Sequence, residues 1–301
     1  MGFACVVLDG ADHLVLVIRL EAPPAVTLNS FAHRLPSCGR SYEDGFGGSL
    51  APMRIYLTGE VCVESDRILI REGRLPGRQG RQAFAYLVWE RRRAVSHAEL
   101  AELLWPDGLP VAWAAAIAAI VSKLRSVLDS AGHDRSAIRA AFSCYQVKLP
   151  HDTWVDVEVA QQSLHEAEAA LRAGDPAHAY GPAVVAATIL RRPFLAGAEG
   201  PWVDARRDIL KSQLVRTLDC LVDLHRWNRE PGLGIQVAEE LLSLEPYRET
   251  AWRSLMLLHV QVGNRGEALS TYRHCHDILA TQLGTVPTEE TEALMRKIAR
   301  I

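Results

Sequence analysis

The stretch 100-LAELLWPDGLPVAWAAAIAAIVSKLRSVL-128 contains two apolar helical patterns, separated by a loop with two prolines and a glycine. The second pattern is rich in alanine and ends in Lys123 and Arg125. Such a pattern fits either a corner of an ordinary helical core or a helix-turn-helix whose second helix enters DNA. The segments on either side decide between these interpretations.

Short strands are expected before the stretch. The runs 53-MRIYLTG-59, 61-VCVES-65 and 67-RILIRE-72 are β-branched and separated by turn residues, which predicts a small antiparallel meander. A helix is expected over 80–93. A second helix is expected to start at a capping box, Ser96 with Glu99, and to end before Pro106.

A hairpin is expected after the third helix, which the pattern places over residues 113–128. Residues 138-IRAAFSCYQVKLP-150 alternate as two strands around a tight turn at Ser143–Cys144. The expected order is strands, two helices, a loop, a third helix and a hairpin, which is the order of a winged helix. An unremarkable α+β domain is the alternative, but it does not require a hairpin directly after a basic helix end.

The chain beyond Trp154 is expected to be helical throughout. Six pairs of residues lie 34 positions apart in this region. They are Leu218 and Trp252, Leu221 and Leu255, Val222 and Met256, His225 and His259, Ala238 and Tyr272, and Leu241 and Cys275. This is the period of tetratricopeptide helix pairs, which bury their apolar faces only against neighbouring units. Earlier helices over about 157–173, 175–192 and 201–228 fit the same stack.

The bulk composition is typical of a globular protein, with 49% hydrophobic and 23% charged residues among 301. The net charge is −3, but it is unevenly distributed. Residues 71–148 carry 12 Lys and Arg against 7 Asp and Glu, a net of +5, and the rest carries 21 against 29, a net of −8. A basic module beside an acidic one is compatible with nucleic-acid binding by the first.

Several classes of function find no support in the sequence. Phosphate loops, nucleophile elbows and zinc-protease motifs are absent, so we expect no enzyme and no cofactor. The tract His274-Cys275-His276 resembles a metal site, but adjacent helical residues diverge by about 100° and do not converge on one ion. Six scattered cysteines, no membrane span and no secretion signal favour a cytoplasmic protein.

The third expected helix has one apolar and one polar side. Ile117, Ile120, Val121, Leu124 and Leu128 form a stripe that we expect to face the core. The other side is expected to meet DNA, together with basic residues from the first helix, the following turn and the wing. The predicted DNA-binding residues are Arg78, Arg81, Arg92, Arg93, Trp113, Ala118, Ser122, Lys123, Arg125, Arg139, Tyr145 and Lys148.

At these positions the sequence resembles the Streptomyces antibiotic regulatory protein (SARP) family and other proteins with a bacterial transcriptional activator domain (BTAD). The resemblance is carried by 75-LPGRQGRQAFAYLVWERRRAVSHAELAELLWPDGLPVAW-113, by IVSKLRSVL at 120–128, by YQVKLP at 145–150 and by residues 245–291. It covers about 53–300. The chain departs from the family at the wing tip, where Ser143-Cys144 precedes Tyr145 in place of the usual glycine.

The resemblance implies a transcription regulator, which we expect to be an activator. Such a protein binds repeated promoter sites as a dimer or side-by-side pair and recruits RNA polymerase. The expected fold is mostly α with a small β component. It comprises an unassigned or flexible arm over 1–50, a winged helix-turn-helix over 51–150 and an all-α tetratricopeptide-like domain over 151–301. Within the arm, residues 13–20 are compatible with a strand. The alternative function is a tetratricopeptide-like interaction scaffold whose winged helix is degenerate.

Overall fold

The computed structural model describes residues 5–9, 13–17, 53–65, 68–132 and 137–300. It divides into two units, residues 1–49 and 50–301. In the first unit, β1 (Cys5–Asp9) and β2 (His13–Val17) form an antiparallel hairpin. A strand within residues 13–20 is thus confirmed, whereas the rest of the predicted arm lies outside the described residues.

The second unit begins with a four-stranded sheet in the order β5-β4-β3-β9. Its strands are β3 (Arg54–Tyr56), β4 (Cys62–Ser65), β5 (Ile68–Ile70) and β9 (Trp154–Val155). The first three form the antiparallel meander that the sequence predicts. The fourth was not expected: Trp154 and Val155 pair in parallel with Arg54 and Ile55, about a hundred residues earlier.

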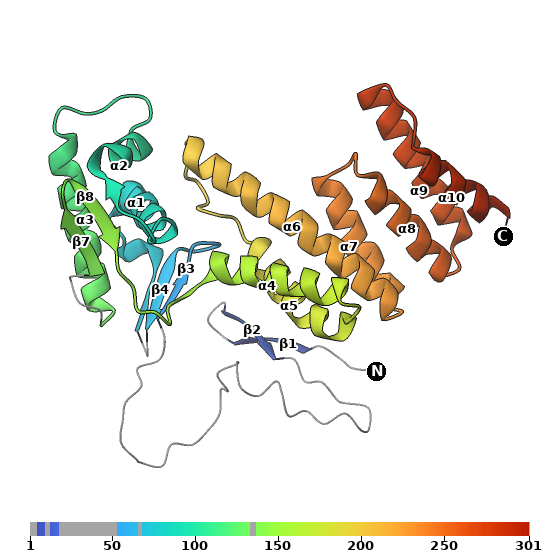
Figure 1. The fold of residues 1–301 in the computed structure, drawn as a ribbon, viewed down its shortest axis with the longest axis horizontal. Helices are drawn as coiled ribbons and strands as arrows, with labels where there is room; N and C mark the ends of the chain where they lie inside the picture. The colour runs from blue at the N-terminus through green and yellow to red at the C-terminus, as the bar shows by residue number, and fades with distance from the viewer. Residues whose placement is uncertain (1–4, 10–12, 18–52, 66–67, 133–136, 301) are drawn as a thin grey trace, which may run out of the picture. The chain divides into compact units, whose positions relative to one another are not determined.

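The segment after this meander has the order of a winged helix (Figure 1). It contains η1 (Glu72–Arg74), α1 (Gly77–Trp89), β6 (Val95–Ser96), α2 (His97–Leu104), α3 (Trp113–Ser130), β7 (Ile138–Ala141) and β8 (Cys144–Val147). The second sheet has the order β6-β8-β7. The predicted capping box forms at the start of α2, where the Glu99 N–H donates to Ser96 Oγ at 3.1 Å.

Two predicted boundaries differ from the structure. Helix α1 ends at Trp89 rather than at residue 93, and the arginines that follow lie in the turn before α2, as expected. The hairpin turn lies at Phe142–Ser143, one residue before the predicted position, and Cys144 begins β8. Both turn residues have positive φ, 49° and 56°, which matches the twist that a two-residue hairpin turn requires.

The remainder is helical and is stacked in successive pairs (Figure 1). The helices are α4 (Asp156–Arg172), α5 (Pro176–Leu190), α6 (Pro201–Trp227), α7 (Pro231–Leu244), α8 (Glu249–Gln261), α9 (Arg265–Ile278), a π-helical turn (Leu279–Leu283) and α10 (Glu289–Arg300). The 34-residue repeat corresponds to the pairs α6–α7 and α8–α9. Equivalent positions such as Leu218 and Trp252 are buried in both pairs, as the repeat requires. The predicted fold class is confirmed.

A buried carboxylate joins this helical stack to the first sheet. Asp156, the first residue of α4, has no exposed surface. Its carboxylate accepts hydrogen bonds from the backbone N–H groups of Leu57, at 2.9 Å, and Thr58, at 2.8 Å, and from the Thr58 hydroxyl at 2.7 Å. The Val157 N–H is a further donor at 2.8 Å. The apolar core is also continuous here: it extends from Met53 to Leu279, across the predicted domain boundary at residue 150.

Aromatic packing joins the two regions at a second point. The Trp89 and Trp202 rings lie edge to face with centroids 6.2 Å apart, one at the end of α1 and the other at the start of α6. The Arg206 guanidinium lies 5.1 Å from the Trp89 ring centroid and forms an ion pair with Glu90 at 3.1 Å. A partly buried cation–π contact of this kind adds to the attraction between the two helices. Helix α1 is thereby held against α6.

Replacing Asp156 with asparagine should test the joining role of the carboxylate. The amide NH2 of asparagine turns a donor towards N–H groups that need an acceptor, so we expect Asp156→Asn to lower the free energy of unfolding by about 2–3 kcal/mol. Urea unfolding followed by circular dichroism measures this change. Asp152→Asn is the matched control, because Asp152 is exposed nearby and should change stability little. Equal effects of both substitutions would contradict the role assigned to Asp156.

Candidate nucleic-acid interface

Helix α3 has one face in the core, as its sequence predicts. Ile117, Val121, Leu124 and Leu128 are almost completely buried, and Ile120 is partly buried against the same core. Since these positions recur every three or four residues, they form one stripe along the helix. The stripe fixes which side of α3 faces solvent.

The opposite face of α3 consists mainly of small residues. Its exposed positions include Ala114, Ala115, Ala118, Ala119, Ser122, Lys123 and Ser126. Small side chains let a helix backbone approach another surface closely, and methyl groups can contact the methyl group of thymine. This face offers a close fit and few hydrogen-bond donors.

A basic pair lies beside this face. Lys123 and Arg74 line a common hollow of about 240 Å³ together with Pro76, Ser126, Val127 and Ser130. Both side chains belong to exposed residues, and neither forms an ion pair within the described part of the chain. Arg74 was not among the predicted residues. Its sequence signal is weak, because it stands alone in a loop four residues before the first predicted basic position.

The wing, which we define as residues 138–147 of β7, its turn and β8, places further positive charge near α3. Arg139 is exposed on β7, and Lys148 is exposed directly after β8. The Arg125 Nε–H donates to the Ile138 carbonyl at 2.9 Å, which joins α3 to the wing. Phe142, at the tip, has a side chain that is 100% exposed.

Tyr145 is placed differently from the prediction. Its side chain is only 5% exposed, and its ring stacks on His97 with centroids 4.4 Å apart. The ring packs the wing against the start of α2 and leaves no surface for DNA. We therefore assign Tyr145 a packing role and omit it from the proposed interface.

Two of the predicted arginines are occupied by protein partners. Arg81 is 9% exposed, and its guanidinium donates to Glu72 at 2.5 Å and to the Ala196 carbonyl at 2.7 Å. Arg93 is held by carboxylates of Glu90, at 2.8 Å, and Glu99. These contacts use the donors that phosphate binding needs, so we also omit both arginines from the interface.

The remaining predicted residues fall into two groups. Arg78 forms an exposed ion pair with Glu199 at 3.6 Å, and Arg92 lines a hollow of about 340 Å³ with α4 residues that include Glu158. Neither arrangement gathers these arginines beside α3. Trp113 starts α3 and is partly buried against the core, where it orients the first turn of the helix.

The described residues contain no group of three or more His, Cys, Asp or Glu side chains placed to hold a metal ion. Within the same ranges, no helix combines the length and apolar character that crossing a membrane requires.

Comparison with known proteins agrees with this architecture. Residues 155–299 match the family model of the bacterial transcriptional activator domain. Regulatory protein AfsR of Streptomyces coelicolor is 27% identical over 254 residues, which are 83% of this chain and 24% of that protein. AfsR of Streptomyces griseus is 27% identical over 225 residues, 74% of this chain and 22% of that protein. The chain thus spans about a quarter of the length of these relatives.

A solved structure is similar over most of the chain. It is Mycobacterium tuberculosis EmbR in complex with a low-affinity phosphopeptide, with a TM-score of 0.74 and 25% sequence identity. The match covers 82% of this chain and 65% of that one. The predicted resemblance to SARP-type proteins that carry a bacterial transcriptional activator domain is confirmed.

The role of Arg93 as a structural partner leads to a pH prediction. The Arg93 and Tyr86 side chains donate to Glu99 and hold its pKa at about 2, below the ordinary value of 4.5. A carboxylate whose pKa is lower in the folded than in the unfolded state stabilises the fold at pH values above its unfolded-state pKa. That stabilisation is lost as the pH falls through the folded-state pKa. Glu99→Gln should therefore cost about 1 kcal/mol at pH 7, allowing for partial exposure.

The difference in unfolding free energy between wild type and Glu99→Gln should narrow between about pH 4.5 and pH 2. Chemical denaturation at a series of pH values measures it. Glu102→Gln, an exposed neighbour on α2, serves as the control and should show no such convergence. A constant difference across this range would mean that Glu99 is not held by Arg93 in solution.

Proposed function

We propose that this chain, which carries a bacterial transcriptional activator domain over residues 155–299, is a SARP-type transcriptional regulator that binds promoter DNA through the exposed face of α3. The observation that carries the proposal is the division of α3 into a buried apolar stripe and an exposed face of small residues beside Lys123 and Arg74. A solvent-facing side is normal for a surface helix, so the proposal rests on the combination of small side chains on that face with two basic side chains beside it.

The dimensions of α3 suit the major groove. Its 18 residues extend about 27 Å, and the major groove of B-DNA is about 12 Å wide, enough to admit a helix. Ala118 and Ser122 lie on its exposed face and would approach base edges, since neither has a long side chain to hold the helix away. Lys123 would meet a phosphate, where it contributes affinity on every sequence.

Arg74 and the wing would extend this contact along the backbone. Arg74 shares a hollow with Lys123, and Arg139 and Lys148 are exposed on and beside the wing. Phosphate contacts from several elements fix the register of a helix on the duplex without reading sequence. Specificity would then come from the few groups on α3 and from the shape of the DNA.

The helical region would supply the regulatory contacts. Tetratricopeptide-like stacks offer extended concave surfaces to other proteins. We assign it contacts with RNA polymerase or with a second copy of this chain on repeated sites, and activation as the outcome. Such a regulator works in the bacterial cytoplasm, where promoter DNA lies, and needs no cofactor.

An interaction scaffold without DNA binding is the competing function. The observation that favours it is the loss of Arg81, Arg93 and Tyr145 to protein contacts, which leaves fewer groups for DNA than the sequence predicts. Gel shifts with the DNA upstream of the chain's own gene decide between the two. Binding no tighter than to random DNA at moderate salt would favour the scaffold and contradict our proposal.

Adjacent residues of α3 should behave in opposite ways. Leu124→Ala opens a cavity in the core and should lower the free energy of unfolding by about 2–5 kcal/mol. Lys123→Ala should leave stability nearly unchanged, weaken binding to all DNA sequences alike, and reduce the slope of log K against log salt by about one unit. Thermal unfolding and salt-dependent gel shifts measure the two effects.

Lys297→Ala is the matched control for Lys123→Ala, because Lys297 is an exposed lysine on α10. It should change neither DNA affinity nor the salt slope. Arg74→Ala should reduce the slope as Lys123→Ala does. Similar destabilisation by Leu124→Ala and Lys123→Ala, or an unchanged slope for Lys123→Ala, would show that the exposed face of α3 is misassigned.

Arg125 should position the helix rather than read a base. Its Nε–H is already bonded to the Ile138 carbonyl, which directs the side chain towards the wing and away from the groove axis. Arg125→Ala should therefore weaken binding by a similar factor on every member of a panel of single-base promoter variants. A flattened preference at one G·C pair, with other positions unaffected, would assign Arg125 to direct reading of guanine.

A further inference from the structure

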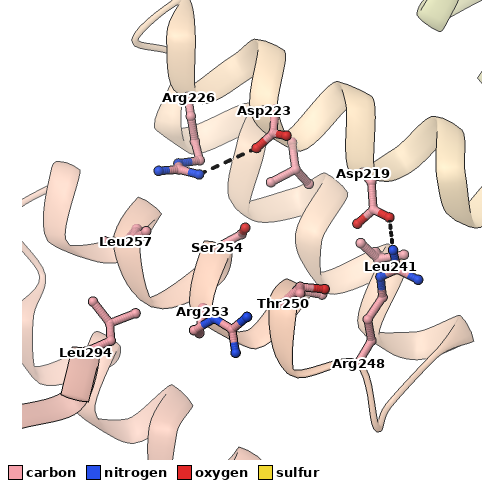
Figure 2. A pocket seen from close by; sticks show the side chains of 12 residues that line it. Asp219, Asp223, Arg226, Leu241, Arg248, Thr250, Arg253, Ser254, Leu257 and Leu294 are labelled. Carbon is pink, nitrogen blue, oxygen red and sulfur yellow. Dashed lines mark hydrogen bonds and ion pairs between the residues drawn. The ribbon is translucent and has the colours of Figure 1, made fainter. Parts of the chain in front are cut away.

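A groove crosses the helical stack far along the chain from α3. It has a volume of about 630 Å³ and is lined by residues of α6, α8 and α10 with Leu241 of α7 (Figure 2). Its apolar part is formed by Val222 and Leu241, which are buried, and by Leu257 and Leu294, which are partly exposed. Aliphatic groups of a ligand would find a matching surface here.

The charged residues of the groove leave a net positive charge. Three guanidinium groups stand against two carboxylates. Arg248 forms an ion pair with Asp219, and Arg226 pairs with Asp223 at 3.5 Å. Arg253 is the third guanidinium. It makes no direct ion pair with a residue that the structure describes, and the nearby Glu249 carboxylate interacts with it electrostatically across the Thr291 hydroxyl.

Arg253 is nevertheless held in place. Its Nη1–H donates to the Thr291 hydroxyl at 3.0 Å, and that hydroxyl donates in turn to Glu249 at 2.7 Å. Figure 2 shows the guanidinium between Thr250 and Leu294, with Ser254 nearby on the same helix. A fixed guanidinium beside free hydroxyl groups is a preorganised site for a planar anion.

The other two guanidinium groups add unsatisfied donors. The Nε atoms of Arg226 and Arg248 are buried, and neither has a hydrogen-bond partner in the described structure. Both side chains line the groove. Buried donors without a partner are costly, and an acceptor reaches these two atoms only if the arginine side chains turn towards the groove.

We propose that this groove binds a peptide segment of a partner protein, with a carboxylate side chain on Arg253 and an aliphatic side chain over Leu257 and Leu294, the accessible apolar residues of its lining. The nitrogens of Arg253 that do not bond Thr291 have no direct carboxylate contact in the described structure, and a guanidinium can hold a carboxylate with two parallel hydrogen bonds. The charged side chains at the rim are between 31% and 63% exposed, so the groove is open rather than enclosing. An open groove of this kind suits a peptide, since small-molecule sites bury most of their ligand.

This site is independent of DNA binding. Arg253 lies on α8, and its hydrogen bond to Thr291 of α10 lies within the helical stack, away from the winged helix in sequence. The groove would give the protein contact proposed for the helical region a defined site, which selects its partner by an acidic and an aliphatic residue. It stands or falls separately from the proposed contact between α3 and DNA.

A library of fluorescein-labelled hexapeptides, in which one position at a time is fixed as each amino acid, provides the probe. Fluorescence polarisation with the full chain measures binding. We expect pools fixed as Asp or Glu to bind at least about tenfold more tightly than pools fixed as Asn or Gln, because a charge-assisted hydrogen bond contributes that much. Pools that also contain Leu or Ile should bind best.

Arg253→Gln should abolish the preference for Asp and Glu, and Arg253→Lys should retain part of it. Arg273→Gln is the matched control, because Arg273 is an exposed arginine on α9 outside the groove. Circular dichroism confirms that each variant is folded, and gel shifts with promoter DNA should be unchanged for all three. Absence of an Asp or Glu preference in the wild type, or its persistence in Arg253→Gln, would overturn the inference.

Discussion

The structure depends on one buried carboxylate that joins distant parts of the chain. Asp156 starts α4, and its oxygens accept hydrogen bonds from the end of β3 and from its own helix start. An acidic residue at this position also complements the partial positive charge of a helix N-terminus. Because the group is fully desolvated, it stabilises the fold only in this one arrangement, with all its donors in place. The helical stack is therefore oriented by the first sheet.

This connection has a consequence for the proposed regulator. The helical stack, which begins at Asp156, also contacts α1, because Trp202 and Arg206 of α6 pack on Trp89. Helix α1 in turn packs on α3. A surface on α3 and a groove on the later helices then belong to one continuous body rather than to two modules on a linker. Binding at either surface would place the other at a fixed distance and direction. That property suits a protein that must present a partner to a particular site on DNA.

Much of the fold follows from periodicity that is visible in the sequence. The 3.6-residue pattern places α3 and its core stripe, and the 34-residue repeat places the pairs α6–α7 and α8–α9. The two-residue strands β6 and β9 are too short to show alternation, and their partners lie far away in the sequence. The predicted position of the hairpin turn differs from the structure by one residue. Neither Phe142 nor Ser143 indicates a positive φ in the way that glycine or asparagine does.

The candidate site is less predictable for a related reason. Sequence shows that Arg81 and Arg93 are basic and near α3, but not that Glu72 and Glu99 fold back to neutralise them. It shows an aromatic ring at Tyr145, but the strand register decides whether that ring faces the core. Arg74 lies beside α3 because η1 and α3 line a shared hollow. Which basic side chains pair with carboxylates depends on contacts between distant segments of the chain. No local sequence pattern encodes these contacts.

Photo-cross-linking from α3 is the most direct measurement of the central claim, that its exposed face meets DNA. A benzophenone amino acid placed at Ala118, which is exposed and makes no contact that the fold needs, is irradiated with labelled DNA from upstream of the chain's own gene. The account predicts a cross-link to bases within the bound site, and none from the same amino acid at Gln162, an exposed position on α4. DNA binding with no cross-link from position 118 would contradict it.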